Sequence, residues 1–269
     1  MNHHRRISRA AGRPAAALAV AGLLIAGCSS GTSGSGSGSG SGGSGGSQAN
    51  TSATTGSGGS GSGTTTAAGS PLFPVAVGEK WVYVDHLGAL GSSTTTNTIK
   101  AIKPVSGGDL VTMTDASHLA GAPAKPTKLT YMFYSDGSIG VPLTQFNGGK
   151  VTIKSGSIVW PSASAIASGQ SHTSVLSVSI KANGQVINEK VHVTVKGGGT
   201  ASVTVPAGTY HATVVDQTQA ETLFGHHVSI ELRTWLAPNV GPVKSEIVSK
   251  SSLGGLAPQV VEELKSFTR

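Results

Sequence analysis

The 269-residue chain has 39 glycines and only 4% aromatic residues, so part of it must lack the apolar side chains that a folded core needs. Its net charge of +7 suggests an acidic partner, but Arg5, Arg6, Arg9 and Arg13 all lie ahead of an apolar run near the start of the chain. Removing these four from the 19 basic residues leaves 15 against 12 acidic residues, a net charge of +3, and the remaining lysines are scattered singly. Because a surface that follows phosphates needs clustered positive charge, we expect no nucleic-acid partner.

Residues 1–27 have the layout of a secretory leader. The four arginines form a basic segment, an apolar stretch runs from Pro14 to Ala26, and small residues precede Cys28. The apolar stretch is shorter than the ~20 residues that a helix needs to cross a bilayer, and no comparable run occurs later in the chain. We therefore predict a signal peptide over residues 1–27 rather than a transmembrane helix.

The end of this leader, Ile25-Ala26-Gly27-Cys28, resembles the lipobox of bacterial lipoproteins, in which a branched apolar residue and two small residues precede an invariant cysteine. The resemblance implies that a signal peptidase recognises Ile25, Ala26 and Gly27 and cuts before Cys28. It also implies a diacylglyceryl group on the Cys28 sulfur and acylation, of the palmitate kind, at the new N-terminus. Two or three acyl chains anchor a protein stably, so the expected location is the extracytoplasmic face of a bacterial membrane.

Two alternatives to the lipid anchor stay open from the sequence. The chain could be an ordinary secreted protein with a chance cysteine, or a substrate of twin-arginine export, which Arg5-Arg6 favours and Ser8-Arg9 disfavours. Cys28 is the only cysteine, so neither a disulfide framework nor a second, catalytic thiol is expected.

Residues 28–70 follow with Ser, Gly, Thr and Ala and almost nothing else. This composition buries too little surface to offset backbone entropy, so we predict a disordered tether behind the lipid-bearing cysteine. A coil of about forty residues spans roughly 35 Å on average and ~140 Å when it is taut. The predicted organisation is a signal peptide (1–27), a lipidated tether (28–70) and an extracytoplasmic domain (71–269).

The region from residue 71 onward has the sequence pattern of an antiparallel sheet, with short apolar runs separated by the turn-forming residues Gly, Pro and Asn. The clearest unit is a hairpin in which Ser174–Ile180 and Gln185–Lys196 flank a turn at Asn183-Gly184. About ten short strands in two hundred residues predict an all-β domain that is either a sandwich or a curled, barrel-like sheet, because a flat sheet of that size would expose an apolar face.

The other predicted strands follow from the same alternation of apolar and polar residues. They are Trp81–His86, Thr94–Ala101, Leu110–Thr114, Leu129–Ser135, Val151–Ile153, Ser202–Val205, Tyr210–Asp216, His227–Trp235 and Val243–Ser249.

Two of these strands depart from simple alternation. In Leu129–Ser135 both faces carry bulky side chains, and in His227–Trp235 the tryptophan falls in line with polar residues. Either a bulge resets the alternation or the second face is covered as well. Covered faces are compatible with a second layer of core, which we favour, or with a ligand cavity.

The C-terminal segment PQVVEELKSF allows two interpretations. Val260, Leu264 and Phe267 keep a helical spacing with Pro258 near the first turn, whereas Leu264 to Thr268 suit an edge strand equally well. The adjacent Glu262-Glu263 is interpreted as a solvated charge run.

Three separated segments together resemble the DUF3108-like, or TapB-like, family of exported bacterial proteins. They are FPVAVGEKWVY (73–83), VTVPAGTYHATVV (203–215) and WLAPNVGPVKSE (235–246). The family shows a "FPL.vG..W.Y" opening, a "V.aGtF.a..v" strand pair and a "WyapgvGlVk" segment in this order. This chain departs from it at Tyr210, Leu236 and Pro242, and Pro242 cannot donate a hydrogen bond to a neighbouring strand.

The resemblance implies an antiparallel β fold in an extracytoplasmic setting and supplies no catalytic residue. The motif residues have structural interpretations in turns, in the core and in a strand connection; they are Gly78, Trp81, Gly208, Trp235, Pro238 and Gly241.

Candidate catalytic or metal-binding groups lack a supporting pattern. There is no H-x-H or H-E-x-x-H, and adjacent His226 and His227 on a strand would point to opposite faces. Serines, histidines and aspartates are numerous, but none stands in a nucleophile motif with the right context. We therefore expect no metal, no cofactor and no enzymatic activity.

Three hypotheses follow for the domain. The first is a lipid-anchored, non-catalytic β domain that binds a ligand or protein partner in the cell envelope. The second is an exported hydrolase with an unrecognised Ser/His/Asp site. The third is a purely structural envelope component. Convergence of one Ser, one His and one Asp would favour the second, and a solidly packed interior without a pocket would favour the third. The size of an interior cavity and the polar groups that converge in it separate the three hypotheses.

Overall fold

The computed structural model describes most of the chain after residue 71. The described residues are 72–87, 91–119, 126–143, 151–182, 185–223, 226–251 and 260–269. The predicted signal peptide, the lipidation site at Cys28 with Ile25, Ala26 and Gly27, and the predicted tether all lie outside the described residues. Among those residues, no helix is both long and apolar enough to cross a membrane.

The described residues form one antiparallel sheet and a short helix, which confirms the predicted all-β class. The sheet order is β6-β8-β9-β10-β11-β12-β13-β1-β2-β3-β4-β5-β7. The elements are β1 (Lys80–His86), β2 (Ser92–Val105), β3 (Gly108–Leu119), β4 (Thr127–Tyr134), β5 (Ile139–Pro142), β6 (Val151–Ser155), β7 (Ser157–Trp160), α2 (Ala163–Ala167), β8 (Ser171–Ala182), β9 (Gln185–Val205), β10 (Gly208–Leu223), β11 (His226–Ala237), β12 (Gly241–Ser251) and β13 (Val260–Thr268).

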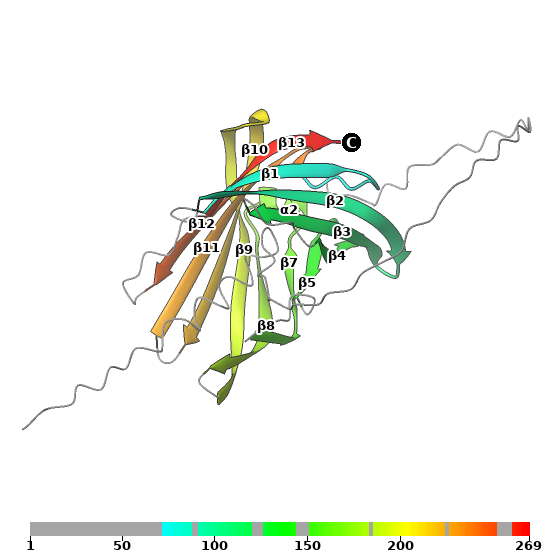
Figure 1. Ribbon diagram of the computed structural model, residues 1–269. Helices are drawn as coiled ribbons and strands as arrows, with labels where there is room; N and C mark the ends of the chain where they lie inside the picture. Colours follow the sequence, from blue (N-terminus) through cyan, green and yellow to red (C-terminus); the bar gives the residue numbers. More distant parts are fainter. Residues whose placement is uncertain are drawn as a thin grey trace, which may run out of the picture.

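The sheet curls until its two ends approach each other. Figure 1 shows the long strands β8 to β12 running at a steep angle to β1, β2 and β3 as the sheet wraps around its interior. The end strand β7 contacts β8 near the other end of the sheet, where the Val159 amide donates to the Ser174 hydroxyl over 3.1 Å. The architecture is therefore a nearly closed barrel, one of the two forms that the sequence predicts.

The hairpin predicted around Asn183-Gly184 is present. Strands β8 and β9 pair from Ala182 opposite Gln185 to Ser171 opposite Lys196, which leaves two residues for the turn. The predicted alternation also holds, because the side chains of Val191, Val193 and Val195 are all fully buried. Period-two patterning therefore determined both the pairing and the buried face of this hairpin.

Strand β9 is longer than the sequence predicts. The predicted break between Lys196 and Ser202 does not occur, and the strand continues through three glycines to Val205. At Gly197 a Cβ atom would collide with the Ile166 carbonyl of α2, so glycine is required for the helix to lie against the strand. The sequence analysis missed the short elements β5, β7 and α2, because four or five residues carry too little periodicity to register.

The C-terminal segment is a strand, which decides between the two interpretations. Strand β13 pairs with β1 on one side and β12 on the other, so it is central and not an edge strand. Its alternation buries Glu262 and fully buries Leu264. The register therefore links the last strand of the chain to the first one.

An aromatic cluster packs inside the barrel where these strands meet. The Trp81 side chain is 1% exposed, and its ring centroid lies 5.2 Å from that of Phe267 and 5.8 Å from that of Phe73. The indole N–H also donates to the Val240 carbonyl oxygen over 2.6 Å. Trp81 thus joins β1 to the turn between β11 and β12, which is distant in the sequence.

Replacing Trp81 should destabilise the domain strongly. We expect Trp81→Ala to lower the free energy of unfolding by about 3–5 kcal/mol, because it leaves a cavity and an unpaired Val240 carbonyl. The matched control is Trp235→Ala on β11, where the ring is only half-buried and the loss should be smaller. Urea unfolding followed by circular dichroism measures both, and an equal loss in the two variants would contradict this packing.

Candidate functional site

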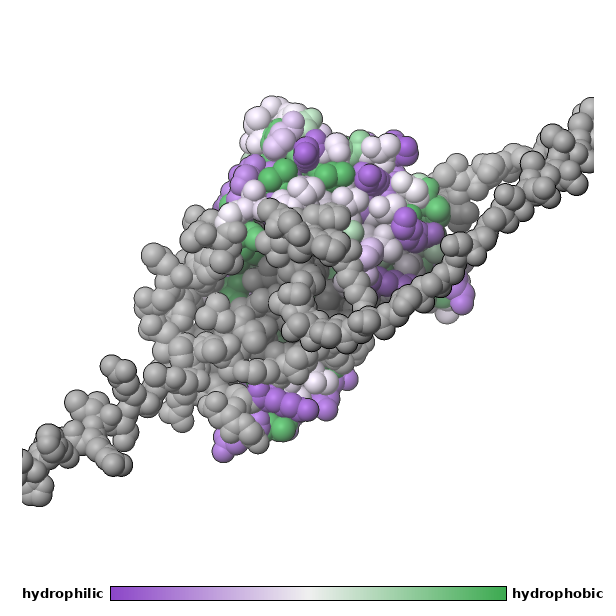
Figure 2. Space-filling model, viewed as in Figure 1, coloured by the Kyte–Doolittle hydropathy of each residue, from purple (hydrophilic) through white to green (hydrophobic). Residues whose placement is uncertain are grey.

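The outer surface offers no obvious site among the described residues. Large hydrophobic side chains exposed there are Val77, Val175 and Val186. Figure 2 shows hydrophobic residues interspersed among hydrophilic and neutral ones on the described part of one face. Scattered single apolar residues are ordinary for a protein surface, so the search for a site moves to the interior.

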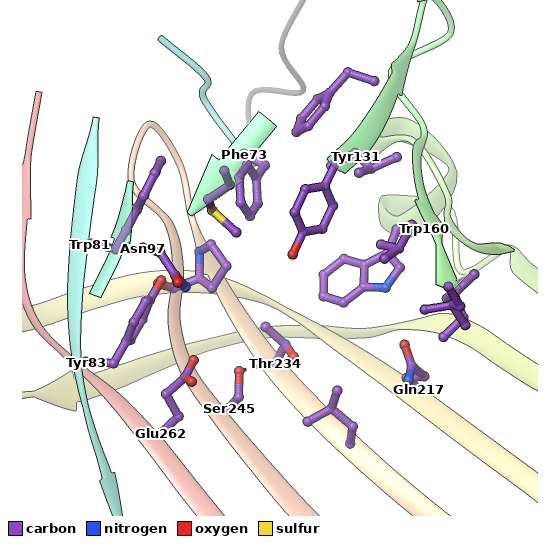
Figure 3. Close-up of a pocket in the computed structure, with 18 residues that line it drawn as sticks. Phe73, Trp81, Tyr83, Asn97, Tyr131, Trp160, Gln217, Thr234, Ser245 and Glu262 are labelled. Atoms are coloured by element: carbon purple, nitrogen blue, oxygen red, sulfur yellow. Dashed lines mark hydrogen bonds between the residues drawn. The ribbon is translucent and has the colours of Figure 1, made fainter. Parts of the chain in front are cut away.

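The interior of the barrel contains a cavity of about 110 Å³. Six aromatic side chains contribute to its wall; they are Phe73, Trp81, Tyr83, Tyr131, Phe133 and Trp160. Figure 3 labels all of these except Phe133 around the open space, with the ring of Tyr131 pointing its hydroxyl toward the centre. An apolar wall with a few polar groups is the usual composition of a small-molecule site.

The two strands with irregular alternation both line this cavity. Strand β4 supplies Tyr131 and Phe133, and β11 supplies Leu232 and Thr234. The register of β11 against β12 shifts between Trp235 and Leu236, as a bulge would require. The cavity-lining residues lie on the inner face of each strand, which therefore encloses a cavity as well as core, whereas Met132, Tyr134 and Trp235 on the second face are only half-buried.

Five polar side chains converge on the same space from β2, β10, β11, β12 and β13. Figure 3 shows them; they are Asn97, Gln217, Thr234, Ser245 and Glu262. All five are more than nine-tenths buried. Such side chains are rarely buried without partners, and the Thr234 and Ser245 hydroxyls lie 3.5 Å from each other.

Glu262 belongs to a pair of buried carboxyl groups. It lies opposite Asp85 in the register of β13 with β1, and the two side chains are 5% and 0% exposed. Ser93 and Thr95 each donate to Asp85 Oδ2 over 2.7 Å. Asp85 Oδ1 and Glu262 Oε2 receive no hydrogen bond from any described donor, which one proton shared between the carboxyls would remedy.

The electrostatics agree with a shared proton. Burial raises the pKa of Glu262 well above its usual range, and the negative charges of Asp85 and Asp115 raise it further. Burial also raises the pKa of Asp85, although the hydrogen bonds from Ser93 and Thr95 partly oppose that shift. Two adjacent carboxyls in a dry site cannot both ionise cheaply, so the pair retains a proton at a higher pH than either group would alone.

Asn97 supplies a further polar group at the cavity. Its side chain is 8% exposed, lines the cavity, and has an Oδ1 atom that receives no hydrogen bond from the described residues. A buried amide oxygen without a donor is costly. This atom is a buried acceptor without a donor, in a residue that lines the space.

The residues of the family motifs surround the site more than they form it. Trp81 lines the cavity, and Pro238 and Gly241 belong to the turn whose Val240 carbonyl accepts its indole N–H. Gly241 has φ of 90°, a conformation that favours glycine, and a Cβ there would approach the Trp81 indole.

The other motif residues lie away from this turn. Trp235 lies half-buried beneath Lys244, whose Nζ is 5.5 Å from the ring centroid. Gly78 and Gly208 have positive φ angles at the starts of β1 and β10.

A Ser/His/Asp constellation is not found among the described side chains. Ser93 does donate to Asp85, but the neighbouring His86 is 53% exposed and lies 3.6 Å from Glu263 on the outer face. His172, His192 and His211 are exposed as well. No group of three potential metal ligands occurs in the part of the chain that the structure describes.

The sequence analysis missed the buried carboxyls. It interpreted Glu262-Glu263 as a solvated run, which is wrong for Glu262, because adjacent residues of a strand face opposite sides. The usable signal was parity, since Trp81, Tyr83 and Asp85 share one face of β1. A helix remained possible for the C-terminal segment, and for that reason the parity of Glu262 could not be assigned.

Comparison with known proteins supports the family resemblance. The model of the DUF3108-like family matches residues 138–253, a range that includes two of the three segments quoted above. No curated protein matches. The resemblance to this family is thereby confirmed for the part of the chain that contains β5 to β12.

Solved structures resemble this chain at low sequence identity. A proposed lipoprotein from Parabacteroides distasonis matches with a TM-score of 0.52 and 17% identity, over 73% of this chain and 98% of its own. A proposed exported protein with a YmcC-like fold from Bacteroides fragilis has a TM-score of 0.49 and 16% identity, over 72% and 96%. The hypothetical lipoprotein YmcC from Escherichia coli has a TM-score of 0.34 and 8% identity, over 71% and 85%. The first match supports the barrel-like fold and nothing more specific.

The buried carboxyl pair should make stability depend on pH. Because the folded-state pKa of Glu262 lies above its value of about 4.5 in the unfolded chain, stability is fully present below that value and falls as pH rises toward the folded pKa. Glu262→Gln has no carboxyl group to ionise at this position, so it lacks this loss of stability with rising pH. The stability of Glu262→Gln relative to the native chain should therefore grow between pH 4 and pH 8, by ~1.4 kcal/mol for each tenfold difference in proton affinity.

Urea unfolding at several pH values measures this difference. Glu189→Gln, a half-buried glutamate on β9 outside the cavity, is the control and should show no such trend. A constant difference between Glu262→Gln and the native chain from pH 4 to pH 8 would contradict the raised pKa.

Proposed function

We propose that this chain is a non-catalytic, lipid-anchored protein on the extracytoplasmic face of a bacterial membrane, and that its barrel binds a small, largely apolar ligand in the interior. The observation that carries the proposal is the cavity itself, with its aromatic wall and its convergent, buried polar groups. A purely structural domain would gain stability by filling this space with side chains. The retained space and the uncompensated polar atoms are better suited to recognition.

The size of the cavity sets the size of the ligand. About 110 Å³ is comparable to the engineered cavity of ~150 Å³ that binds benzene, so a single ring with a short substituent fits inside. Phe73, Tyr131 and Trp160 offer ring faces and edges to such a group. A larger ligand would place only one end in this space.

The anchoring part of the proposal rests on the N-terminal sequence. A basic and apolar leader ends in the lipobox-like Ile25-Ala26-Gly27-Cys28, and a Gly/Ser tether follows. The structurally similar protein from Parabacteroides distasonis is itself described as a proposed lipoprotein. Acyl chains on Cys28 would hold the barrel near a membrane while leaving the cavity accessible.

Filling the cavity should abolish ligand binding. Benzyl alcohol is a suitable probe, because Trp81 and Trp160 line the space and their fluorescence should change when it binds. Val141→Trp places a large side chain in the cavity and should weaken binding at least tenfold. Val175→Trp, at an exposed position on β8, should leave binding unchanged. Equal binding by both variants, or no binding by the native chain, would refute an interior site.

Removing the proposed lipid site should release the protein. We expect Cys28→Ser to shift the protein from the membrane fraction to the periplasm or medium, since no acyl chain can be attached. The control is Ser30→Ala, which keeps the cysteine and should remain with the membrane. Fractionation and mass spectrometry of the N-terminal peptide measure this, and firm membrane attachment of Cys28→Ser would contradict the anchor.

A further inference from the structure

We propose that the cavity selects ligands whose polar end donates hydrogen bonds and carries no negative charge, and that a protonated amine is the preferred end. This inference rests on the proposed function, since it names the chemistry that the same interior site would recognise. It follows from the acidic charge at the cavity, from the hydrogen-bond acceptors on its wall, and from the hydrogen bonds that Trp81 and Tyr83 already make.

The charge near the cavity is acidic. Glu262 lines the space, Asp85 lies beside it, and Asp115 is close enough for its charge to act on Glu262. The described residues that line the cavity include no lysine or arginine. Even with one proton shared by Asp85 and Glu262, a negative charge remains in the interior. An ammonium group would compensate that charge, whereas a carboxylate or phosphate would add to it.

The hydrogen-bonding groups point to the same class of ligand. Asn97 Oδ1 is an acceptor that no described group satisfies, and Glu262 presents a carboxyl group to the same space. Figure 3 shows Asn97 and Glu262 projecting toward the cavity from β2 and β13, the two strands on either side of β1, with the Ser245 hydroxyl nearby. A head with two or three N–H or O–H donors can satisfy these acceptors together.

Two aromatic donors of the wall are already engaged. The Trp81 indole N–H donates to the Val240 carbonyl over 2.6 Å, and the Tyr83 hydroxyl donates to the Pro242 carbonyl over 3.0 Å. Neither can turn toward an anion without breaking a buried hydrogen bond. An anionic ligand would therefore find these two donors already paired, and it would lie beside the acidic groups Asp85 and Glu262.

The remaining wall suits the apolar part of an amine. Phe73, Tyr131 and Trp160 face the acidic side of the cavity across the open space in Figure 3. Aromatic faces also attract cations directly, so a ring-bearing or short alkyl amine gains from both sides of the site. Asn97 and Glu262 lie on the other side of the open space from Tyr131 and Trp160 in this view.

Three probes with one ring and different heads test the proposal on the native chain at pH 7. Benzylamine is cationic, benzyl alcohol is a neutral donor and benzoate is an anion. Titration calorimetry with tryptophan fluorescence should give a dissociation constant about tenfold lower for benzylamine than for benzyl alcohol, because charge-assisted hydrogen bonds are stronger. Benzoate should bind at least tenfold more weakly than benzyl alcohol.

A substitution then tests whether Glu262 causes the preference for benzylamine over benzyl alcohol. Glu262→Gln keeps the shape of the side chain and should bring benzylamine and benzyl alcohol to similar affinities. Glu263→Gln, the outward-facing neighbour on the same strand, should keep the preference. Circular dichroism verifies that both variants are folded. If Glu262→Gln fails to fold, the order of the three probes on the native chain still decides the proposal.

The outcomes separate this inference from the proposed function. Benzoate binding as tightly as benzylamine would overturn the inference and leave interior binding intact, as would a preference for benzylamine that Glu262→Gln does not alter. Failure of all three probes to bind would overturn the inference and the proposed function together. Benzylamine bound most tightly, with its preference lost in Glu262→Gln alone, supports both.

Discussion

The hydrogen bond from the Trp81 indole to the Val240 carbonyl is the constraint on which the barrel depends. It joins the first strand to the turn between β11 and β12, across 159 positions of sequence. The rings of Phe73 and Phe267 pack on the same indole, so the segment before β1 and the last strand meet there as well. The sheet closes on its opposite side, where β7 meets β8, and each inward position of β1 then acquires a fixed environment.

Two kinds of environment result from one alternation. On β1, the side chains of Trp81, Tyr83 and Asp85 all face the interior. One face of the strand therefore carries two aromatic rings and a carboxyl group. Buried carboxyls lower stability unless they are neutralised or paired, so their presence is a cost that packing alone would not retain. The cavity lies beside them, since Glu262 also lines the open space. The cavity and the carboxyl pair are therefore best understood as parts of one site.

Much of the fold could be predicted because its signals are local. The hairpin of β8 and β9 follows from Asn183-Gly184 and from the alternation of Val191 with His192, which need no knowledge of the rest of the chain. The short strands β5 and β7 and the continuation of β9 past Gly197 could not be predicted. They depend on contacts with distant elements, such as the approach of the Ile166 carbonyl to β9, and not on their own residues.

By itself, the sequence determined the all-β class, the antiparallel hairpins and the family resemblance, because period two and turn residues act between neighbours in the chain. Only the tertiary structure decided that the C-terminal segment is a strand, that Glu262 faces inward while Glu263 faces out, and that a cavity exists at all. The physical reason is closure. The face of a strand that becomes the interior, and the groups that meet there, are set by the curvature and register of the whole sheet.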